Sequence, residues 1–117
     1  MKFLFILNDP PYGTERNYNA LRLAHALAKA EPGTGVTVFL MADAVSGGHK
    51  NQKVPQGYYT VERMLKQVAA GGGEVLLCGT CMDARGLADA DLMEGARRST
   101  MAELAAATLA ADKVLVF

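Results

Sequence analysis

The sequence predicts a flavodoxin-like, three-layer α/β fold, in which a mostly parallel sheet of four to five strands has helices on both faces. Short apolar runs alternate with helical patterns in the order β-α-β-α-β-irregular-α-β. The apolar runs are continuous and do not alternate apolar with polar residues, which is typical of strands covered on both faces. Right-handed crossovers between such strands give a doubly wound sheet.

The predicted strands are four apolar runs. They are residues 3–7 (Phe-Leu-Phe-Ile-Leu), 36–41 (Val-Thr-Val-Phe-Leu-Met), 75–78 (Val-Leu-Leu-Cys) and 114–117 (Val-Leu-Val-Phe). Residues 87–98 are ambiguous, because they fit either a short helix near 89–94 or a brief fifth strand near 94–98.

Three helical patterns lie between these runs. The first covers residues 14–30 and ends at Pro32-Gly33. The second covers residues 60–70, with apolar residues at i, i+3, i+4, i+7 and i+8, and a run of three glycines ends it. The third covers residues 100–111 and begins with a Thr-x-x-Glu capping box. Its predicted inward-facing residues are Met101, Leu104, Ala105, Thr108 and Leu109.

Length and charge limit the class of protein. A chain of 117 residues fits one domain, residues 1–117. The net charge is zero, which gives no electrostatic case for binding nucleic acid or a membrane. No apolar run approaches the ~20 residues of a membrane span, and the N-terminal run is too short for a signal peptide. We therefore expect a cytoplasmic protein with reduced thiols, and the low net charge hints at a homo-oligomer.

The sharpest local signal is the run Leu77-Cys78-Gly79-Thr80-Cys81. Two thiols at this spacing can share a disulfide, bind a metal, or act as an attacking and a resolving thiol. Cys78 is predicted at a strand end and Cys81 in the loop beyond it. A nearby Arg85 guanidinium and the amides of the Gly79-Thr80 turn would favour a thiolate and lower the cysteine pKa.

Simpler interpretations of the cysteines remain open. A cysteine at the end of an apolar strand is often a small buried hydrophobe. A structural zinc site needs four ligands, and only His25 and His49 could complete one, so we expect no metal. A thioredoxin-type site is disfavoured, because there the pair opens a helix, whereas a glycine-bearing loop is predicted here.

Three loops should meet at the carboxyl edge of the sheet, where ligands of such folds gather. They are residues 8–14, 42–50 and 78–86. We expect Asp83 and Arg85 to form a local ion pair, and residues 44–58 form a connection long enough to have a role of their own. No phosphate loop or dinucleotide fingerprint is present, so no cofactor is predicted. The candidate pocket residues are Asn8, Tyr12, Gly13, Asp43, Gly79, Thr80 and Asp83.

Five segments, in order along essentially the whole chain, carry a resemblance to a known family. They are residues 8–15 (Asn-Asp-Pro-Pro-Tyr-Gly-Thr-Glu), 39–45 (Phe-Leu-Met-Ala-Asp-Ala-Val), Gly57-Tyr58, 77–86 (Leu-Cys-Gly-Thr-Cys-Met-Asp-Ala-Arg-Gly) and 111–117 (Ala-Asp-Lys-Val-Leu-Val-Phe). Together they resemble the DsrE/DsrF-like family, and most closely its small YchN-like branch.

The resemblance implies a flavodoxin-like fold, a homo-oligomer (a trimer or hexamer) and kinship with sulfur-relay proteins. In those proteins one cysteine accepts sulfane sulfur as a persulfide and passes it to a partner protein. That cysteine corresponds to Cys78, and the Arg-Gly that follows it corresponds to Arg85-Gly86. Cys81 has a counterpart in the YchN-like branch but none in the relay proteins.

The leading hypothesis is therefore a cytosolic sulfur-handling protein with sulfurtransferase-like activity. Cys78 would accept the sulfur, Arg85 and turn amides would stabilise its charge, and Cys81 would resolve the persulfide. Sulfur-donor and sulfur-acceptor proteins are the expected partners. Two alternatives stay open: a non-catalytic homo-oligomeric module that binds a small molecule or protein at the three loops, and a Cys78/Cys81 thiol-disulfide switch.

Overall fold

The computed structural model describes residues 1–117 and contains a five-stranded sheet in the order β4-β3-β2-β1-β5. All four strand pairs are parallel, which confirms the predicted flavodoxin-like α/β architecture. The strands are β1 (Lys2–Leu7), β2 (Gly35–Leu40), β3 (Glu74–Cys78), β4 (Ala96–Ser99) and β5 (Lys113–Val116).

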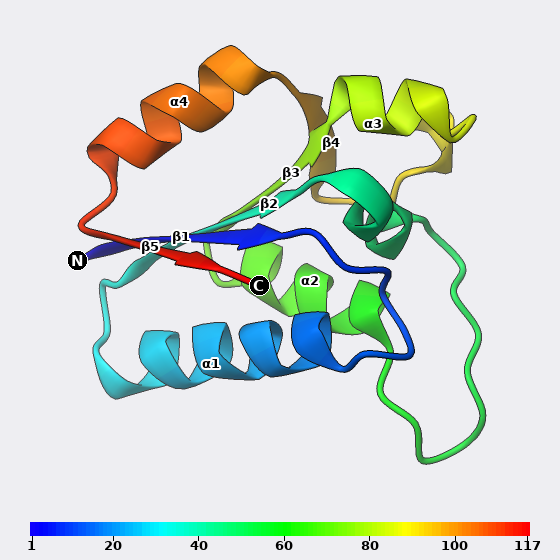
Figure 1. Cartoon of the computed structure of the whole chain (residues 1–117). Coiled ribbons are helices and arrows are strands. Elements are labelled where there is room, and N and C mark those ends of the chain that lie inside the picture. The colour runs from blue at the N-terminus through cyan, green and yellow to red at the C-terminus, as the bar shows by residue number, and fades with distance from the viewer.

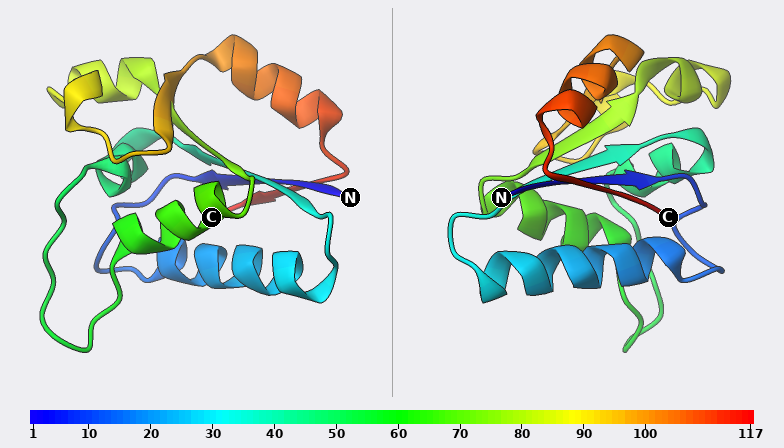
Figure 2. Two further views of the ribbon diagram at one scale, coloured as in Figure 1. Left: turned by 180° about the vertical axis from the view of Figure 1, so that it is seen from behind. Right: turned by 60° about the vertical axis from the view of Figure 1, so that its left-hand side comes forward.

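Helices cover both faces of this sheet (Figures 1 and 2). Helices α1 (Arg16–Ala30) and α2 (Val61–Ala70) lie side by side on one face. Helices α3 (Gly79–Ala84) and α4 (Met101–Ala110) lie on the other. Two short 3₁₀ helices, η1 (Ala42–Gly48) and η2 (Asp89–Asp91), belong to the connections. None of the helices is long and apolar enough to cross a membrane.

The predicted strands and the first two helices fold as their patterns indicate. The middle strands supply side chains with almost no exposure, such as Phe5, Phe39 and Leu77. Helix α2 buries Val61, Leu65 and Val68, the stripe expected from its spacing. Continuous apolar strands and one-sided helical stripes therefore meet in the same core.

The ambiguous stretch 87–98 contains both of the elements considered for it. Residues 89–91 form the short helix η2, and β4 follows as the edge strand beside β3. The register places Ser99 opposite Cys78. This pairing places the end of β4 directly beside the cysteine motif.

Two expectations about local structure are wrong. Cys81 does not lie in a loop, because Gly79–Ala84 form helix α3 and Cys78 is its N-cap residue. In α4 only Leu104 is buried, whereas Met101 is 61% and Leu109 88% exposed. The helix is rich in alanine, so it has few large side chains to fix its orientation, and Ala105 and Thr108 also remain exposed.

Candidate functional site

Cys78 lies where β3 ends and α3 begins. Its side chain is 6% exposed, and its Sγ is 3.2 Å from Thr80 Oγ1. The first amides of a helix have no partner within the helix, so they are available to a negatively charged group at the N-cap. The chain thus places a thiol where a thiolate would be stabilised.

The environment lowers the pKa of Cys78. Burial alone would raise this pKa, but the Thr80 hydroxyl, the Cys81 amide, the Cys81 thiol and the Thr80 amide together outweigh it. The pKa of Cys81 is raised, first by burial and then by the neighbouring Cys78 sulfur. The two thiols are therefore unequal: Cys78 is the thiolate-forming partner and Cys81 keeps its proton.

The loop after β2 contacts the second thiol. The backbone amide of Ala42 donates a hydrogen bond to Cys81 Sγ at 3.2 Å. Ala42 has a φ of 49°, which is uncommon for a residue with a Cβ. Such strained conformations often mark functional sites, and here it accompanies the amide contact to sulfur.

Arg85 connects α3 to η1 and does not reach Cys78. Its Nε and one terminal nitrogen lie 3.0 Å and 2.9 Å from Asp43 Oδ1, and its other terminal nitrogen donates to the Cys81 carbonyl at 3.0 Å. The guanidinium is among the groups that lower the pKa of Cys81, whereas the groups that most lower the pKa of Cys78 belong to Thr80 and Cys81.

The predicted ion pair between Asp83 and Arg85 is wrong. Asp83 pairs with Arg98 at 3.0 Å, and Arg85 pairs with Asp43. Residues two positions apart at the end of a helix do not face each other, so the two side chains point to different neighbours.

Arg98 is a site residue that the sequence motifs do not single out. Its guanidinium donates to the Gly79 carbonyl at 3.1 Å, to Asp83 at 3.0 Å and to Asp89 at 2.8 Å. The signal that could have found it is the strand pattern, since a strand over residues 96–99 lies next to β3 only if it extends the parallel sheet.

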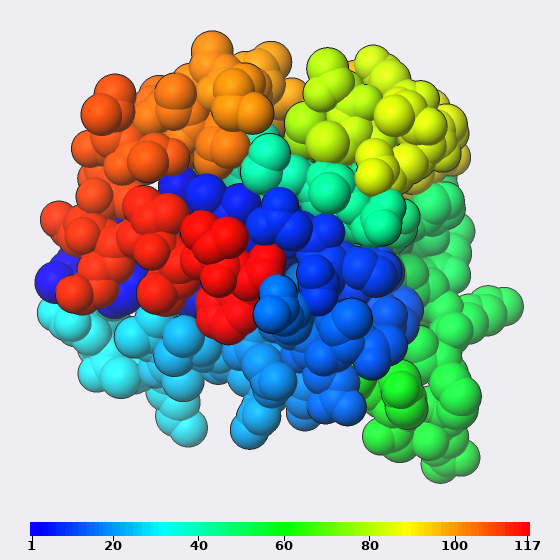
Figure 3. Space-filling model, viewed as in Figure 1, coloured from blue at the N-terminus to red at the C-terminus, as the bar shows by residue number.

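A hollow of about 260 Å³ opens beside Cys78. It lies between α3 and the start of α4, the two helices that share one face of the sheet in Figures 1 and 3. Its lining combines hydroxyls, one cation, one carboxylate and a thiol, so a polar group of a partner molecule could approach the sulfur here. The lining residues are Cys78, Gly79, Thr80, Asp83, Arg98, Ser99, Thr100 and Met101.

The candidate residues of the first loop have other contacts. Asn8 donates from its side chain to the carbonyl of Phe117 at 3.2 Å, and Gly13 is exposed with a φ of 110°. The Tyr12 hydroxyl donates to Gln52 Oε1 and accepts from the amide of Val61 at 3.1 Å. The structure therefore joins the first loop to the segment before α2 and not to the cysteines.

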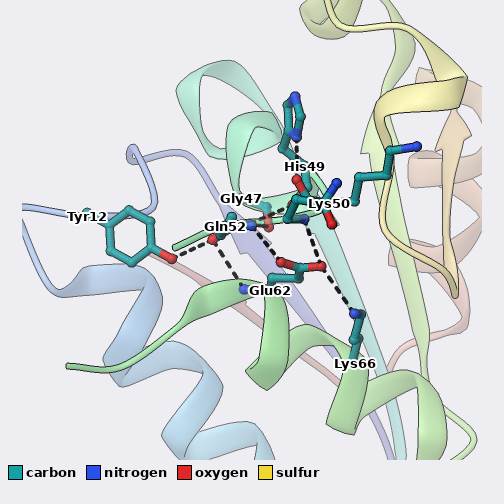
Figure 4. A network of polar contacts seen from close by, with 8 residues as sticks. Tyr12, Gly47, His49, Lys50, Gln52, Glu62 and Lys66 are labelled. Atoms are coloured by element: carbon teal, nitrogen blue, oxygen red, sulfur yellow. Dashed lines mark hydrogen bonds and ion pairs between the residues drawn. The ribbon is translucent and has the colours of Figure 1, made fainter. Parts of the chain in front are cut away.

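That segment, residues 49–60, extends away from the body (Figure 1) but is held at its start by Glu62 (Figure 4). The buried carboxylate accepts the amides of Asn51 at 3.2 Å and Gln52 at 2.8 Å, and Lys66 lies 3.1 Å away. Burial raises the pKa of Glu62, but the Gln52 amide, Lys66 and the Asn51 amide outweigh it and lower the pKa. Sequence reasoning missed Glu62, because an acidic residue in a first helical turn is usually exposed.

No group of three or more His, Cys, Asp or Glu side chains is arranged to hold a metal ion.

Comparisons with known proteins agree with this fold. The DsrE/DsrF-like family profile matches residues 1–117. The protein YchN of Escherichia coli K12 is 43% identical over 116 residues, which cover 99% of this chain and 98% of YchN. An uncharacterized protein of Methanocaldococcus jannaschii, MJ0989, is 39% identical over the full length of both chains.

Solved structures give the same result. The crystal structure of E. coli YchN superposes with a TM-score of 0.94, over 99% of this chain and 98% of that one. The structure of MTH1491 from Methanobacterium thermoautotrophicum, a protein of unknown function, has a TM-score of 0.81 over the same shares at 12% identity, and shares the fold. The chain therefore belongs to the DsrE/DsrF-like family, in its YchN-like branch.

Proposed function

We propose that this protein is a cytosolic persulfide carrier that uses Cys78 as its sulfur acceptor. The observation that supports this best is the place of Cys78 at the N-cap of α3, with the Thr80 hydroxyl 3.2 Å from its sulfur and a hollow open to a partner molecule beside it. These surroundings lower the pKa of Cys78. Membership of the DsrE/DsrF-like family suggests a role in sulfur relay. A reducing compartment keeps such a thiol available.

The proposed loading step is a sulfane-sulfur transfer. The Cys78 thiolate attacks the outer sulfur of a donor persulfide, R–S–SH. The donor S–S bond breaks, a new S–S bond forms on Cys78, and the donor leaves as a thiolate that takes up a proton. Unloading repeats the step with an acceptor thiolate as the attacking group, so no external oxidant or reductant is consumed.

Cys81 provides a second outcome for the loaded site. Its sulfur can attack the inner sulfur of the Cys78 persulfide, which forms a Cys78–Cys81 disulfide and releases hydrosulfide. The raised pKa of Cys81 keeps this thiol protonated and slows the attack. The amide of Ala42 also engages the Cys81 sulfur. We infer that Cys81 resolves the persulfide only when no acceptor is present.

The test is mass spectrometry of reduced protein after incubation with a small-molecule persulfide. We expect Cys78 to gain one sulfur and Cys78→Ser to gain none at this position. Cys81→Ser, which keeps a hydroxyl in place of the thiol, should hold the added sulfur longer than the wild type. A reduced and folded Cys81→Ser variant, which cannot resolve the persulfide, without added sulfur on Cys78 would rule the carrier out.

A thiol-disulfide switch is the second candidate, because each of the two thiols affects the pKa of the other. It needs an oxidant, such as a low-molecular-weight disulfide. The same mass spectra distinguish the two, since oxidation removes two hydrogens and adds no sulfur. A Cys78–Cys81 disulfide formed with the low-molecular-weight disulfide, together with no sulfur gained by Cys81→Ser from the persulfide, would favour the switch.

We further propose that the protein works as a homo-oligomer, a trimer or hexamer, with sulfur-donor and sulfur-acceptor proteins as partners. Large apolar side chains on α4 and β5 support this, because Leu109 and Val116 are 88% and 65% exposed. A single chain gains nothing from leaving them in water.

A further inference from the structure

Strand β4 carries two neighbouring arginines that serve different elements. Successive strand residues point to opposite faces of a sheet, so Arg97 and Arg98 cannot share partners. Arg97 binds Glu103 at 2.9 Å and Glu74 at 3.5 Å, and neither carboxylate lines the hollow beside Cys78. Arg98 turns to the start of α3. The pair thus offers a site residue and a matched control on the same strand.

The contact between Arg98 and α3 depends on a glycine. A Cβ at position 79 would lie 2.9 Å from one terminal nitrogen of Arg98 and 3.1 Å from its Cγ. With glycine here, the guanidinium reaches the Gly79 carbonyl, 3.1 Å away, without having to shift around a Cβ. Arg98 and Gly79 are therefore fitted to each other beside Cys78.

The carbonyl that Arg98 binds lies between Cys78 and Thr80, whose hydroxyl is 3.2 Å from the Cys78 sulfur. The Gly79 carbonyl and the Thr80 amide are two ends of one planar, conjugated group. Arg98 therefore holds the peptide that carries the Thr80 hydroxyl, and the Thr80 amide also contributes to the lowered pKa of Cys78. A donor on the carbonyl polarises the unit and makes its N–H a stronger donor, by about 10–30% for linked hydrogen bonds.

The positive charge of Arg98 also acts on the thiolate directly. Asp83 and Asp89 bind the same guanidinium, so the three groups together carry a net negative charge and as a group do not favour a thiolate. The other charged or titratable groups near the sulfur are the Cys81 thiol and, on the far side of it, Arg85 with Asp43. Because Arg98→Lys keeps the positive charge but lacks the planar fork, it separates the hydrogen bond to the peptide from the field.

We propose that Arg98 is a positioning residue, which holds and polarises the Gly79–Thr80 peptide against Cys78 and so couples the reactivity of the thiol to the edge strand β4. The inference rests on the proposed role of Cys78 as the attacking thiol. It adds that this reactivity is set by two elements, α3 and β4, and not by the cysteine motif alone.

The test is the pH dependence of Cys78 alkylation by iodoacetamide in the full chain, with the modified peptide assigned to Cys78 by mass spectrometry. Arg98→Gln should move the midpoint to higher pH, so that the thiolate fraction near pH 7 falls roughly two- to fivefold. Arg98→Lys keeps a charge but lacks the planar fork, and should move the midpoint less far in the same direction. Arg97→Gln should leave it in place.

Each result has one interpretation. An unchanged midpoint in folded Arg98→Gln, or an equal shift in Arg97→Gln, overturns the positioning role. Full recovery by Arg98→Lys assigns the effect to charge and overturns it too. If Arg98→Gln does not fold, the Arg98→Lys midpoint decides alone. A wild-type midpoint near the ordinary thiol value of ~8.5 would contradict the activated thiolate, and with it the proposed function.

Discussion

The chemical difference between Cys78 and Cys81 comes from their positions in one short helix. Cys78 is the N-cap of α3, where free amides favour a thiolate, whereas Cys81 lies within the helix against the Ala42 amide. Burial raises the pKa of both thiols, and only Cys78 has enough donors to reverse it. A lowered pKa also makes Cys78 a better leaving group when an acceptor attacks its persulfide.

The Thr80 hydroxyl lowers the pKa of Cys78 more than any other neighbouring group, so replacing it gives a prediction for a single residue. Thr80→Val keeps the shape but removes the hydroxyl 3.2 Å from Cys78 Sγ, so we expect the pKa of Cys78 to rise. Loss of one hydrogen bond to a charged sulfur should reduce the thiolate fraction near pH 7 by roughly tenfold. Iodoacetamide alkylation against pH measures this. Thr80→Ser keeps the hydroxyl and should retain the wild-type midpoint. A Thr80→Val midpoint equal to that of wild type would show that the Thr80 hydroxyl does not stabilise the Cys78 thiolate.

At the scale of elements, the sequence predicts those strands that have a long and continuous apolar run. Four continuous apolar runs are long enough to identify β1, β2, β3 and β5. Strand β4 (Ala-Arg-Arg-Ser) is short and charged, and its place follows from pairing with β3. Helix α3 contains a glycine in its first turn, which resembles a loop when only local propensity is considered.

Within the candidate site, the local sequence predicts some features and not others. The two cysteines and the place of Cys78 at a strand end were predictable, because they belong to one short run of the sequence. The hydrogen bonds from Arg98 and Ala42 were not predictable. These residues lie 19 and 39 positions from their partners in the motif, and only the sheet brings them together. Contacts that depend on which strands are neighbours need the topology first.

Glu62 gives a prediction for the segment before α2. Glu62→Gln keeps the size of the side chain but loses the charge that two loop amides and Lys66 bind, so the free energy of unfolding at pH 7 should fall by about 1–3 kcal/mol. Because folding lowers the pKa of Glu62, its contribution is complete above the unfolded value of about 4.3 and is lost as the pH falls through the lower folded value.

Urea unfolding of both proteins at pH 7 and under acidic conditions measures this difference. The gap between wild type and Glu62→Gln should narrow at acid pH. Glu94→Gln changes an exposed glutamate and should match wild type at pH 7. A gap that stays constant with pH would show that the ionised carboxylate is not the source of the stability.

At the scale of the whole molecule, the reactive hollow and the exposed apolar side chains of α4 share one residue, Met101. Met101 lines the hollow beside Cys78 and also begins α4, where it is 61% exposed. Leu109 follows on the same helix, and β5 forms the open edge of the sheet with Val116. A second copy packed on this face would therefore border the hollow, so assembly and access to Cys78 are expected to be coupled.

Lysine substitutions on this face test the proposed homo-oligomer. Burying a large aliphatic side chain stabilises by ~1.5–3 kcal/mol, and a lysine in its place leaves a buried charge without a partner. We expect wild type to be a trimer or hexamer by sedimentation velocity, and the double variant Leu109→Lys with Val116→Lys to be a monomer of unchanged fold. Leu23→Lys, on α1 across the sheet (Figure 2), is the matched control and should keep the wild-type mass.

A monomeric wild type would exclude the assembly, and a double variant with the wild-type mass would place the interface on another face. Slower loading of Cys78 in the monomeric variant would show that the neighbouring copy completes the hollow.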